Sequence, residues 1–140
     1  MDIKKLMIGD WLRIKSTHVI GQVTRLCTYK NIDHNTVNIN NIICDINGVE
    51  PIVLNSDILK TPKCKNNLNN EYVFSNKNFV IILRCVKHIY NTNIYNVVIK
   101  ENCDNSCNKC SEVTFGYIKY VHELQHLLDM FDITCEINID

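Results

Sequence analysis

The sequence of 140 residues contains no alanine and few residues of glycine, proline and arginine. It has 4 glycines and 2 prolines, whereas asparagine and isoleucine are abundant. Residues with GC-rich codons are scarce, which indicates a gene from an AT-rich genome. The missing alanine removes the strongest helix former, and the many isoleucine, valine and tyrosine residues favour strands. The composition therefore predicts a β-rich chain, and its length fits one ordinary domain.

Long apolar runs are also absent. No stretch of about 18 apolar residues occurs, which excludes a helical membrane span, so no membrane partner is expected. The first residues, Met1–Trp11, have neither the apolar centre nor the small-residue cleavage site of a signal peptide. We therefore expect a cytoplasmic protein in which most of the 8 cysteines are reduced.

The chain also lacks a net charge, because 15 Lys and Arg residues balance 15 Asp and Glu residues. The balance hides an asymmetry. Residues 1–30 have six basic and two acidic residues (+4), and residues 121–140 have five acidic and no basic ones (−5). The two ends can attract each other within the fold or between subunits, so a homo-oligomer is one expectation. A nucleic-acid partner is not expected, because such binders usually show a net basic balance or a basic stripe.

Short strands are predicted through most of the chain by alternating apolar and polar residues. They cover 11–14, 19–27, 36–39, 42–46, 50–54, 72–74, 79–86, 94–99 and 113–115. The dipeptide Asn47-Gly48 predicts a tight turn, and Asn55 or Ser56 is placed to cap a one-turn helix over 57–60. Cysteines within the strand patterns are expected to be small core residues. They are Cys27, Cys44 and Cys85.

One long helix is predicted, over Tyr117–Phe131. Its apolar side chains share a broad face and its histidines lie opposite, so we expect it to dock on a sheet and present His122 and His126 to solvent. The alternation over 133–139 predicts a last strand. The predicted fold class is α+β: one curved antiparallel sheet or SH3-like barrel with the C-terminal amphipathic helix packed on it. Residues 1–140 then form a single β-rich domain, with sub-halves 1–62 and 71–140 as an alternative division.

The helix contains the motif H-E-x-x-H, at His122, Glu123 and His126. Two histidines four residues apart on a helix bind Zn²⁺ in many hydrolases, with the glutamate as general base. Asp132 stands ten residues after His122, where metzincin-type proteases place a third ligand. Against a hydrolase, only eight residues follow Asp132, and Asp129 replaces the glycine of that pattern. One alternative is a non-catalytic metal site or charged patch, and another is two histidines on a solvated helix face.

A second candidate metal site is the spacing C-x3-C-x2-C at Cys103, Cys107 and Cys110. Radical-SAM enzymes hold a [4Fe–4S] cluster with this spacing, but 140 residues are too few for their barrel. Three thiolates with Cys64, Cys135 or a histidine as the fourth ligand can hold a structural Zn²⁺. A polar hairpin loop with free thiols is the alternative.

Candidate binding residues are Trp11, Arg13 and Asp129. Trp11 follows Gly9-Asp10 at a strand start, where it can anchor a ligand or partner or simply be packed. Asp129 lies in the last turn of the predicted helix, where the helix dipole disfavours anions. We expect the basic N-terminal segment (Lys4, Lys5 or Arg13), protonated His126, a partner or a cation to offset this charge.

Three segments together resemble a known group of sequences. They are Ile8–Leu12 (IGDWL), Glu50–Leu59 (EPIVLNSDIL) and Ile118–Leu127 (IKYVHELQHL). The chain resembles small uncharacterised proteins of phages and mobile elements in gut Bacteroidales, which share an IGN-W/Y-V start, an EPIPLT middle and a YVH-x-LQN-L helix. The resemblance implies a phage-type accessory protein and implies no established activity. It also implies that the H-E-x-x-H is a variant of a docking helix.

The sequence leads to one main functional hypothesis. We expect a non-catalytic accessory protein that binds a host protein or a small ligand in the host cytoplasm, with counter-defence as one such role and no cofactor. The first alternative is a zinc-dependent hydrolase with His122, His126 and Asp132 as ligands and Glu123 as base. The second is a structural subunit of a virion.

Overall fold

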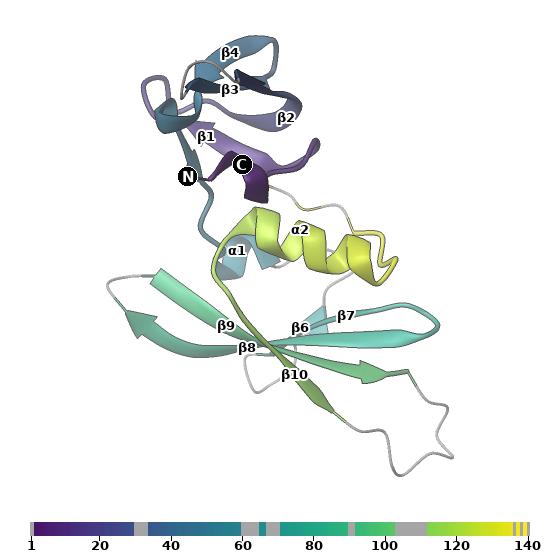
Figure 1. Ribbon diagram of the computed structural model, residues 1–140. Coiled ribbons are helices and arrows are strands. Elements are labelled where there is room, and N and C mark those ends of the chain that lie inside the picture. The colour runs from purple at the N-terminus through teal and green to yellow at the C-terminus, as the bar shows by residue number, and fades with distance from the viewer. Residues whose placement is uncertain are drawn as a thin grey trace. The chain divides into compact units, whose positions relative to one another are not determined.

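The computed structural model describes residues 2–29, 34–59, 65–66, 71–89, 92–102, 112–135, 137 and 139. Within these residues, antiparallel strands form two five-stranded sheets, and one long helix lies near the C-terminus (Figure 1). The predicted α+β class, antiparallel strands with one C-terminal helix packed on a sheet, is confirmed. No helix among the described residues is long and apolar enough to cross a membrane.

The chain divides into two compact units, which we describe separately. The first unit comprises Met1–Ile52 and Tyr120–Gln125, and the second comprises Val53–Lys119 and His126–Asp140. The first unit has strand order β4-β3-β2-β1-β5. Its elements are η1 (Ile3–Lys5), β1 (Trp11–Ile14), β2 (Ile20–Tyr29), β3 (His34–Ile39), β4 (Ile42–Asp45), η2 (Ile46–Gly48) and β5 (Val49–Pro51).

The first sheet encloses a core of aliphatic side chains. They come from every strand except β4, from both 3₁₀ helices and from the residue that follows η1: Ile3, Leu6, Leu12, Ile14, Val23, Val37, Ile39, Ile46 and Val49. Asn47-Gly48 does form a turn, the 3₁₀ helix η2, but the strand that follows pairs with β1 and not with β4. Pro51 stands at the end of β5 on an edge of the sheet, where a missing N–H is tolerated.

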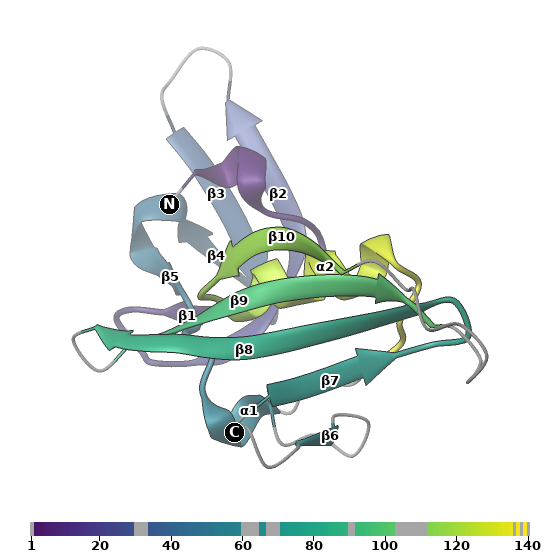
Figure 2. The same ribbon diagram turned by 90° about the horizontal axis from the view of Figure 1, so that it is seen from below.

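The second unit has strand order β10-β9-β8-β7-β6, and Figure 2 shows these strands side by side in this order. Its elements are α1 (Ser56–Leu59), β6 (Lys65–Asn66), β7 (Glu71–Ser75), β8 (Phe79–Ile89), β9 (Thr92–Glu101) and β10 (Val113–Ile118). The predicted one-turn helix is confirmed as α1, and Asn55 caps it, because its Oδ1 accepts a hydrogen bond from the Ile58 N–H at 2.9 Å.

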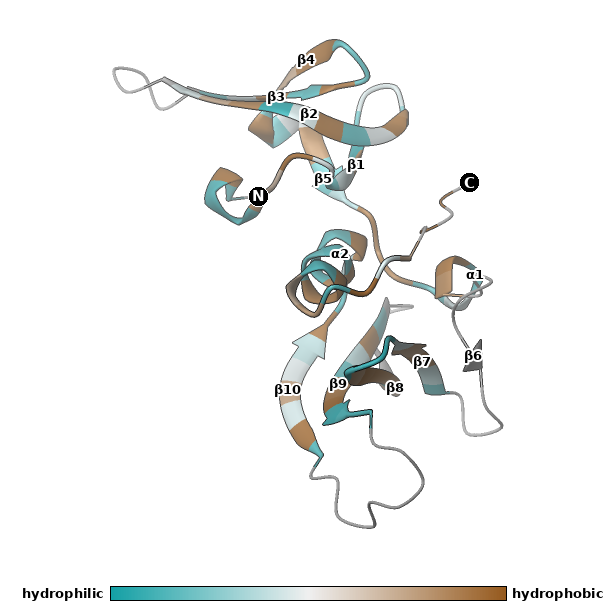
Figure 3. Cartoon of the chain, turned by 90° about the vertical axis from the view of Figure 1, so that its right-hand side faces the viewer, coloured by the Kyte–Doolittle hydropathy of each residue, from teal (hydrophilic) through white to brown (hydrophobic). Residues whose placement is uncertain are grey.

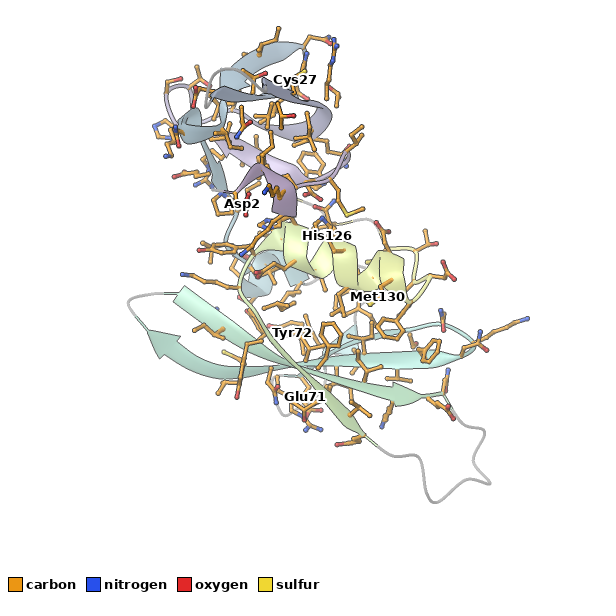
Figure 4. All side chains as sticks on the ribbon, in the orientation of Figure 1. Asp2, Cys27, Glu71, Tyr72, His126 and Met130 are labelled. Carbon is orange, nitrogen blue, oxygen red and sulfur yellow. The ribbon has the colours of Figure 1, made fainter. Side chains whose placement is uncertain are left out.

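Consecutive residues of β7 show the two faces of the second sheet. Tyr72 is buried and Glu71 lies on the opposite face (Figure 4). The face with Tyr72 carries most of the buried side chains: Tyr72, Phe74, Ile81, Leu83, Tyr95, Val97, Ile99 and Ile118. The Phe79 and Phe131 rings meet edge-on at 5.0 Å, and the Asn76 side-chain amide donates to the Phe131 carbonyl at 2.7 Å. These contacts join the end of the last helix to this sheet.

The last helix, α2 (Val121–Met130), begins later than predicted. Tyr117 and Ile118 belong to β10, because they pair with Asn96 and Tyr95 of β9. The apolar positions Val121, Leu124, Leu127 and Leu128 are buried, as the periodicity predicts. The expected exposure of the histidines is wrong for His122, which is only 8% exposed, and His126 is half-buried. The predicted strand over 133–139 is also wrong for the described residues of this tail.

Candidate binding site

Glu123, the candidate catalytic base, caps the helix that contains it. The Tyr120 N–H donates to Glu123 Oε2 at 3.0 Å. Tyr120 directly precedes α2 and Glu123 is its third residue, so the carboxylate reaches back to a backbone donor at the helix start, as in a capping box. An acidic group in the first turn also faces the positive end of the helix dipole. This geometry gives Glu123 a structural task.

Asp132, the candidate third ligand, ends the same helix. Its φ of 54° places it in the left-handed region. The Ile133 N–H donates to the Leu128 carbonyl at 2.9 Å, and the Asp132 N–H donates to the Asp129 carbonyl at 3.1 Å. These two bonds define a Schellman motif, and Leu128 and Ile133, the positions that are usually apolar in this motif, are both buried. Asp132 occupies the position that glycine or asparagine usually takes.

The histidines of the motif have different surroundings. The His122 ring is stacked on the Tyr120 ring, with centroids 5.8 Å apart and an interplanar angle of 9°. His122 is 8% exposed, so its imidazole is buried and not presented to solvent. No three His, Cys, Asp or Glu residues in the described part of the chain come together in a way that could hold a metal ion. His122, His126 and Asp132 therefore form no three-ligand set in this structure.

Gln125, inside the same motif, attaches the helix to the start of β1. Its Oε1 accepts from the Trp11 N–H and its Nε2 donates to the Gly9 carbonyl, both at 3.0 Å. Gly9 adopts a φ of +98°, which favours glycine. Sequence reasoning gave Gln125 no role, because nothing in the sequence indicates which backbone groups need a partner.

The remaining candidate residues are placed as follows. Trp11 is half-buried in β1. Arg13 Nη1 lies 3.3 Å from Glu50 Oε1, its neighbour across β1 and β5, so its ion pair lies within the first sheet. Asp129 is exposed and forms no ion pair with any described residue. The cysteines of the second candidate site lie outside the described residues. They are Cys103, Cys107 and Cys110. Cys64, a possible fourth ligand, also lies outside the described residues.

The strand cysteines divide between the two faces of their sheets. Cys44 packs against the core of the first unit as expected, and burial raises the pKa of its thiol. Cys27 differs from the prediction, because it is half-buried on the outer face of β2 and not in the core (Figure 4). Its neighbours there form a hollow of about 120 Å³ on the outer face of β2, β3 and β4. The hollow is lined by Arg25, Cys27, Thr36, Asn38 and Ile43.

The register of the strands explains how these side chains meet. Arg25 stands opposite Asn38, and Asn38 stands opposite Ile43, which gives one row across three strands. Cys27 stands opposite Thr36, two residues further along each strand on the same face. Directly opposed residues share a face, so the hollow joins a guanidinium, an amide, a hydroxyl and an aliphatic side chain.

A β-bulge places Arg25 on the outer face. The register of β2 against β3 shifts between Val23 and Arg25, which makes Thr24 the extra residue. Strict alternation would put Arg25 on the side of buried Val23. The bulge moves Arg25 outward and brings Leu26 to the core. The Thr24 hydroxyl donates to Asn38 Oδ1 at 3.2 Å and so orients the amide that lines the hollow.

The exposed groups of the hollow have few partners among the residues that the structure describes. Arg25 is exposed, and no described carboxylate lies within ion-pair distance of its guanidinium. Ile43 is 73% exposed, so its aliphatic side chain is accessible at the hollow. The site thus offers a planar fork of N–H donors beside an apolar surface.

Comparison of the chain with models of protein families, with curated proteins and with solved structures found no match. The candidate site therefore stands on its geometry alone.

Proposed function

We propose that this chain is a non-catalytic binding protein of a phage or mobile element, acting in the host cytoplasm, and that its binding site is the hollow on β2, β3 and β4. The observation that carries the proposal is the exposed Arg25 guanidinium beside the exposed Ile43 side chain. A guanidinium recognises carboxylates through paired hydrogen bonds. The partner is therefore a protein segment in which an acidic side chain neighbours an aliphatic one.

The size of the hollow favours a protein partner over a small ligand. Sites for small molecules usually measure roughly 300–1,000 Å³, whereas this hollow measures about 120 Å³. It accommodates one side chain of a partner and would leave most of a larger ligand in solvent. The rest of the contact would come from the flat outer face of the three strands, with Ile43 as an apolar anchor.

The roles of Glu123 and Asp132 at the two ends of α2 make the hydrolase alternative less attractive. The Glu123 carboxylate caps the helix start, and the left-handed backbone of Asp132 closes the helix end. The binding hypothesis needs no metal.

The experiment is an array of short peptides that place Asp or Glu beside Ile or Leu, each matched with its Asn or Gln counterpart. We expect the protein to prefer the acidic peptides. Arg25→Gln should weaken binding about tenfold or more, because a charge-assisted hydrogen bond contributes about 1.5–3 kcal/mol. Ile43→Ser should remove the preference for a neighbouring aliphatic residue.

Arg13→Gln is the matched control, since it removes an arginine from the same sheet outside the hollow. It should leave peptide binding unchanged. Equal binding of acidic and amide peptides, or equal loss in Arg13→Gln and Arg25→Gln, would contradict the proposal.

A further inference from the structure

The edge strand of the second sheet exposes large apolar side chains. β10 is the last strand of the order β10-β9-β8-β7-β6 within the described residues. Val113, Phe115 and Tyr117 are 60%, 52% and 67% exposed, and the hydropathy colouring shows apolar bands along the strand (Figure 3). An edge strand of this kind is a template for pairing with another strand. This feature is independent of the hollow on the first sheet.

A β-bulge divides β10 into two halves. Val113 and Thr114 stand opposite Ile99 and Val98 of β9. After a register shift at Phe115, residues 116, 117 and 118 stand opposite 97, 96 and 95. Val113 and Ile118 therefore share the face of buried Ile99 and Tyr95, and Thr114 and Tyr117 share the other face.

The bulge allows two copies of β10 to pair antiparallel with matching faces. When two copies of a strand pair antiparallel about a two-fold axis, each residue must lie on the same face as the residue it opposes. A regular strand cannot satisfy this condition about a point between two consecutive residues, because their faces alternate. In β10 the extra residue Phe115 shifts the alternation by one position, so that residues at equal distances from a point between 115 and 116 share a face. With the axis between residues 115 and 116, Val113 opposes Ile118 and Thr114 opposes Tyr117.

We propose that β10 pairs antiparallel with β10 of a second copy of this chain, about a two-fold axis between Phe115 and Gly116. At the centre, the Phe115 ring of each copy covers Gly116 of the other. The space around Gly116 is open, with no atom within 4 Å of where a Cβ would stand. An aromatic side chain across from a glycine shields its backbone and is a known way to stabilise such a position.

The charges that flank β10 complete the match. Glu112 precedes the strand and Lys119 follows it. In the proposed register, Glu112 of each copy opposes Lys119 of the other, which gives two identical opposite-charge pairs. Glu112 is exposed and lies 3.9 Å from Arg84 in its own chain, a distance at the limit of an ion pair. Charge pairs at a rim contribute mainly to register and orientation.

A second copy fits this edge better than an unrelated strand, because both the side-chain pairs and the charges are self-complementary in one register. An unrelated peptide would need to supply an apolar pair, an aromatic over glycine and both charges in the correct order. The dimer joins two five-stranded sheets into one continuous sheet and removes the exposed β10 edge of each copy.

Sedimentation velocity over a range of protein concentrations tests the pairing. We expect a reversible dimer for the full chain. Glu112→Lys and Lys119→Glu should each weaken dimerisation about tenfold, because each creates two like-charge contacts. The double variant Glu112→Lys/Lys119→Glu should restore dimerisation, because the two charges again oppose each other. Phe115→Lys should give a monomer.

Val86→Lys, at an exposed position of β8 in the same unit, is the control and should dimerise like the unaltered chain. Far-UV circular dichroism verifies that each variant is folded. A monomeric unaltered chain would overturn the proposal, even if a peptide bound to the edge. A dimer that survives Phe115→Lys, or that the double charge reversal does not restore, would overturn it as well. None of these outcomes depends on the peptide preference of the hollow.

Discussion

At the residue scale, Tyr95 shows how burial changes the chemistry of one side chain. It is 1% exposed in the core of the second unit, and its ring meets the Tyr72 ring edge-on at 6.1 Å. Burial raises the pKa of its hydroxyl to about 12, although a hydrogen bond from the Asn93 amide at 3.3 Å opposes the shift. The neutral hydroxyl is thus strongly favoured in the folded chain.

This shift predicts a loss of stability at alkaline pH. Above the ordinary pKa of 10.0 the unfolded chain releases the Tyr95 proton, whereas the folded chain keeps it until about 12. The contribution of Tyr95 is therefore complete below pH 10 and is lost as the pH rises toward 12. Two pKa units correspond to about 2–3 kcal/mol. Between pH 10 and about 12, the unfolding free energy of Tyr95→Phe should therefore fall by about 2–3 kcal/mol less than that of the unaltered chain. Urea unfolding at a series of pH values measures this difference.

Tyr117→Phe, measured at protein concentrations where the chain is monomeric, is the control, because Tyr117 is a largely exposed tyrosine of the same sheet. Its unfolding free energy should follow the pH dependence of the unaltered chain. An alkaline loss that is identical in Tyr95→Phe and Tyr117→Phe would show that the Tyr95 hydroxyl does not cause it.

At the element scale, α2 illustrates what a sequence motif leaves open. Its apolar periodicity correctly predicted Val121, Leu124, Leu127 and Leu128 as core residues. The helix start was wrong, because Tyr117 fits an apolar helical face and an exposed strand position equally well. Burial of His122 was also not predictable, since the side chains that pack around a helix come partly from outside it. Local periodicity contains no information about such a neighbour.

Substitutions at the two ends of α2 should change the unfolding free energy in opposite directions. Glu123→Ala removes the capping carboxylate and should lower the unfolding free energy by about 1 kcal/mol, whereas Glu123→Gln keeps an acceptor and should have a smaller effect. Asp132→Gly relieves the left-handed backbone and should raise stability by about 0.5–1 kcal/mol. Thermal and urea unfolding measure both.

These two ends also separate the capping roles from the zinc hypothesis. A Zn²⁺ site would make Asp132→Gly weaken metal binding and stability together. A protein that is stabilised by Asp132→Gly, and whose unfolding does not respond to added Zn²⁺, fits the Schellman geometry. Destabilisation by Asp132→Gly would contradict the assignment of this residue to the helix end.

The candidate site shows the same limit at the level of strands. All four strands predicted before residue 47 exist, and their lengths are close to those expected. Arg25, however, was visible in the sequence only as one basic charge. Strict alternation would place it on the face of Val23, because one extra residue in β2 changes the phase of everything after it. The bulge has no signature in the sequence that separates it from regular alternation.

At the scale of the whole molecule, composition predicted the balance of strand and helix, and the structure bears this out. It did not predict two sheets, because the strands of both units have the same pattern and pairing depends on long-range contacts. The proposed dimer adds a test at this scale. The melting temperature of the unaltered chain should rise with protein concentration, since association stabilises the folded state. Phe115→Lys should melt at a temperature independent of concentration.

The bulge at Thr24 also bears on how the length of this chain can vary. Deleting Thr24 would bring Val23 and Arg25 into consecutive register with Ile39 and Asn38, without turning any other side chain of β2 to the opposite face. A deletion at Leu26 would reverse every later position of the strand. Thr24 is thus the point in β2 where a one-residue gap in an alignment is structurally neutral. A related chain that lacks it would still present its arginine to the outside.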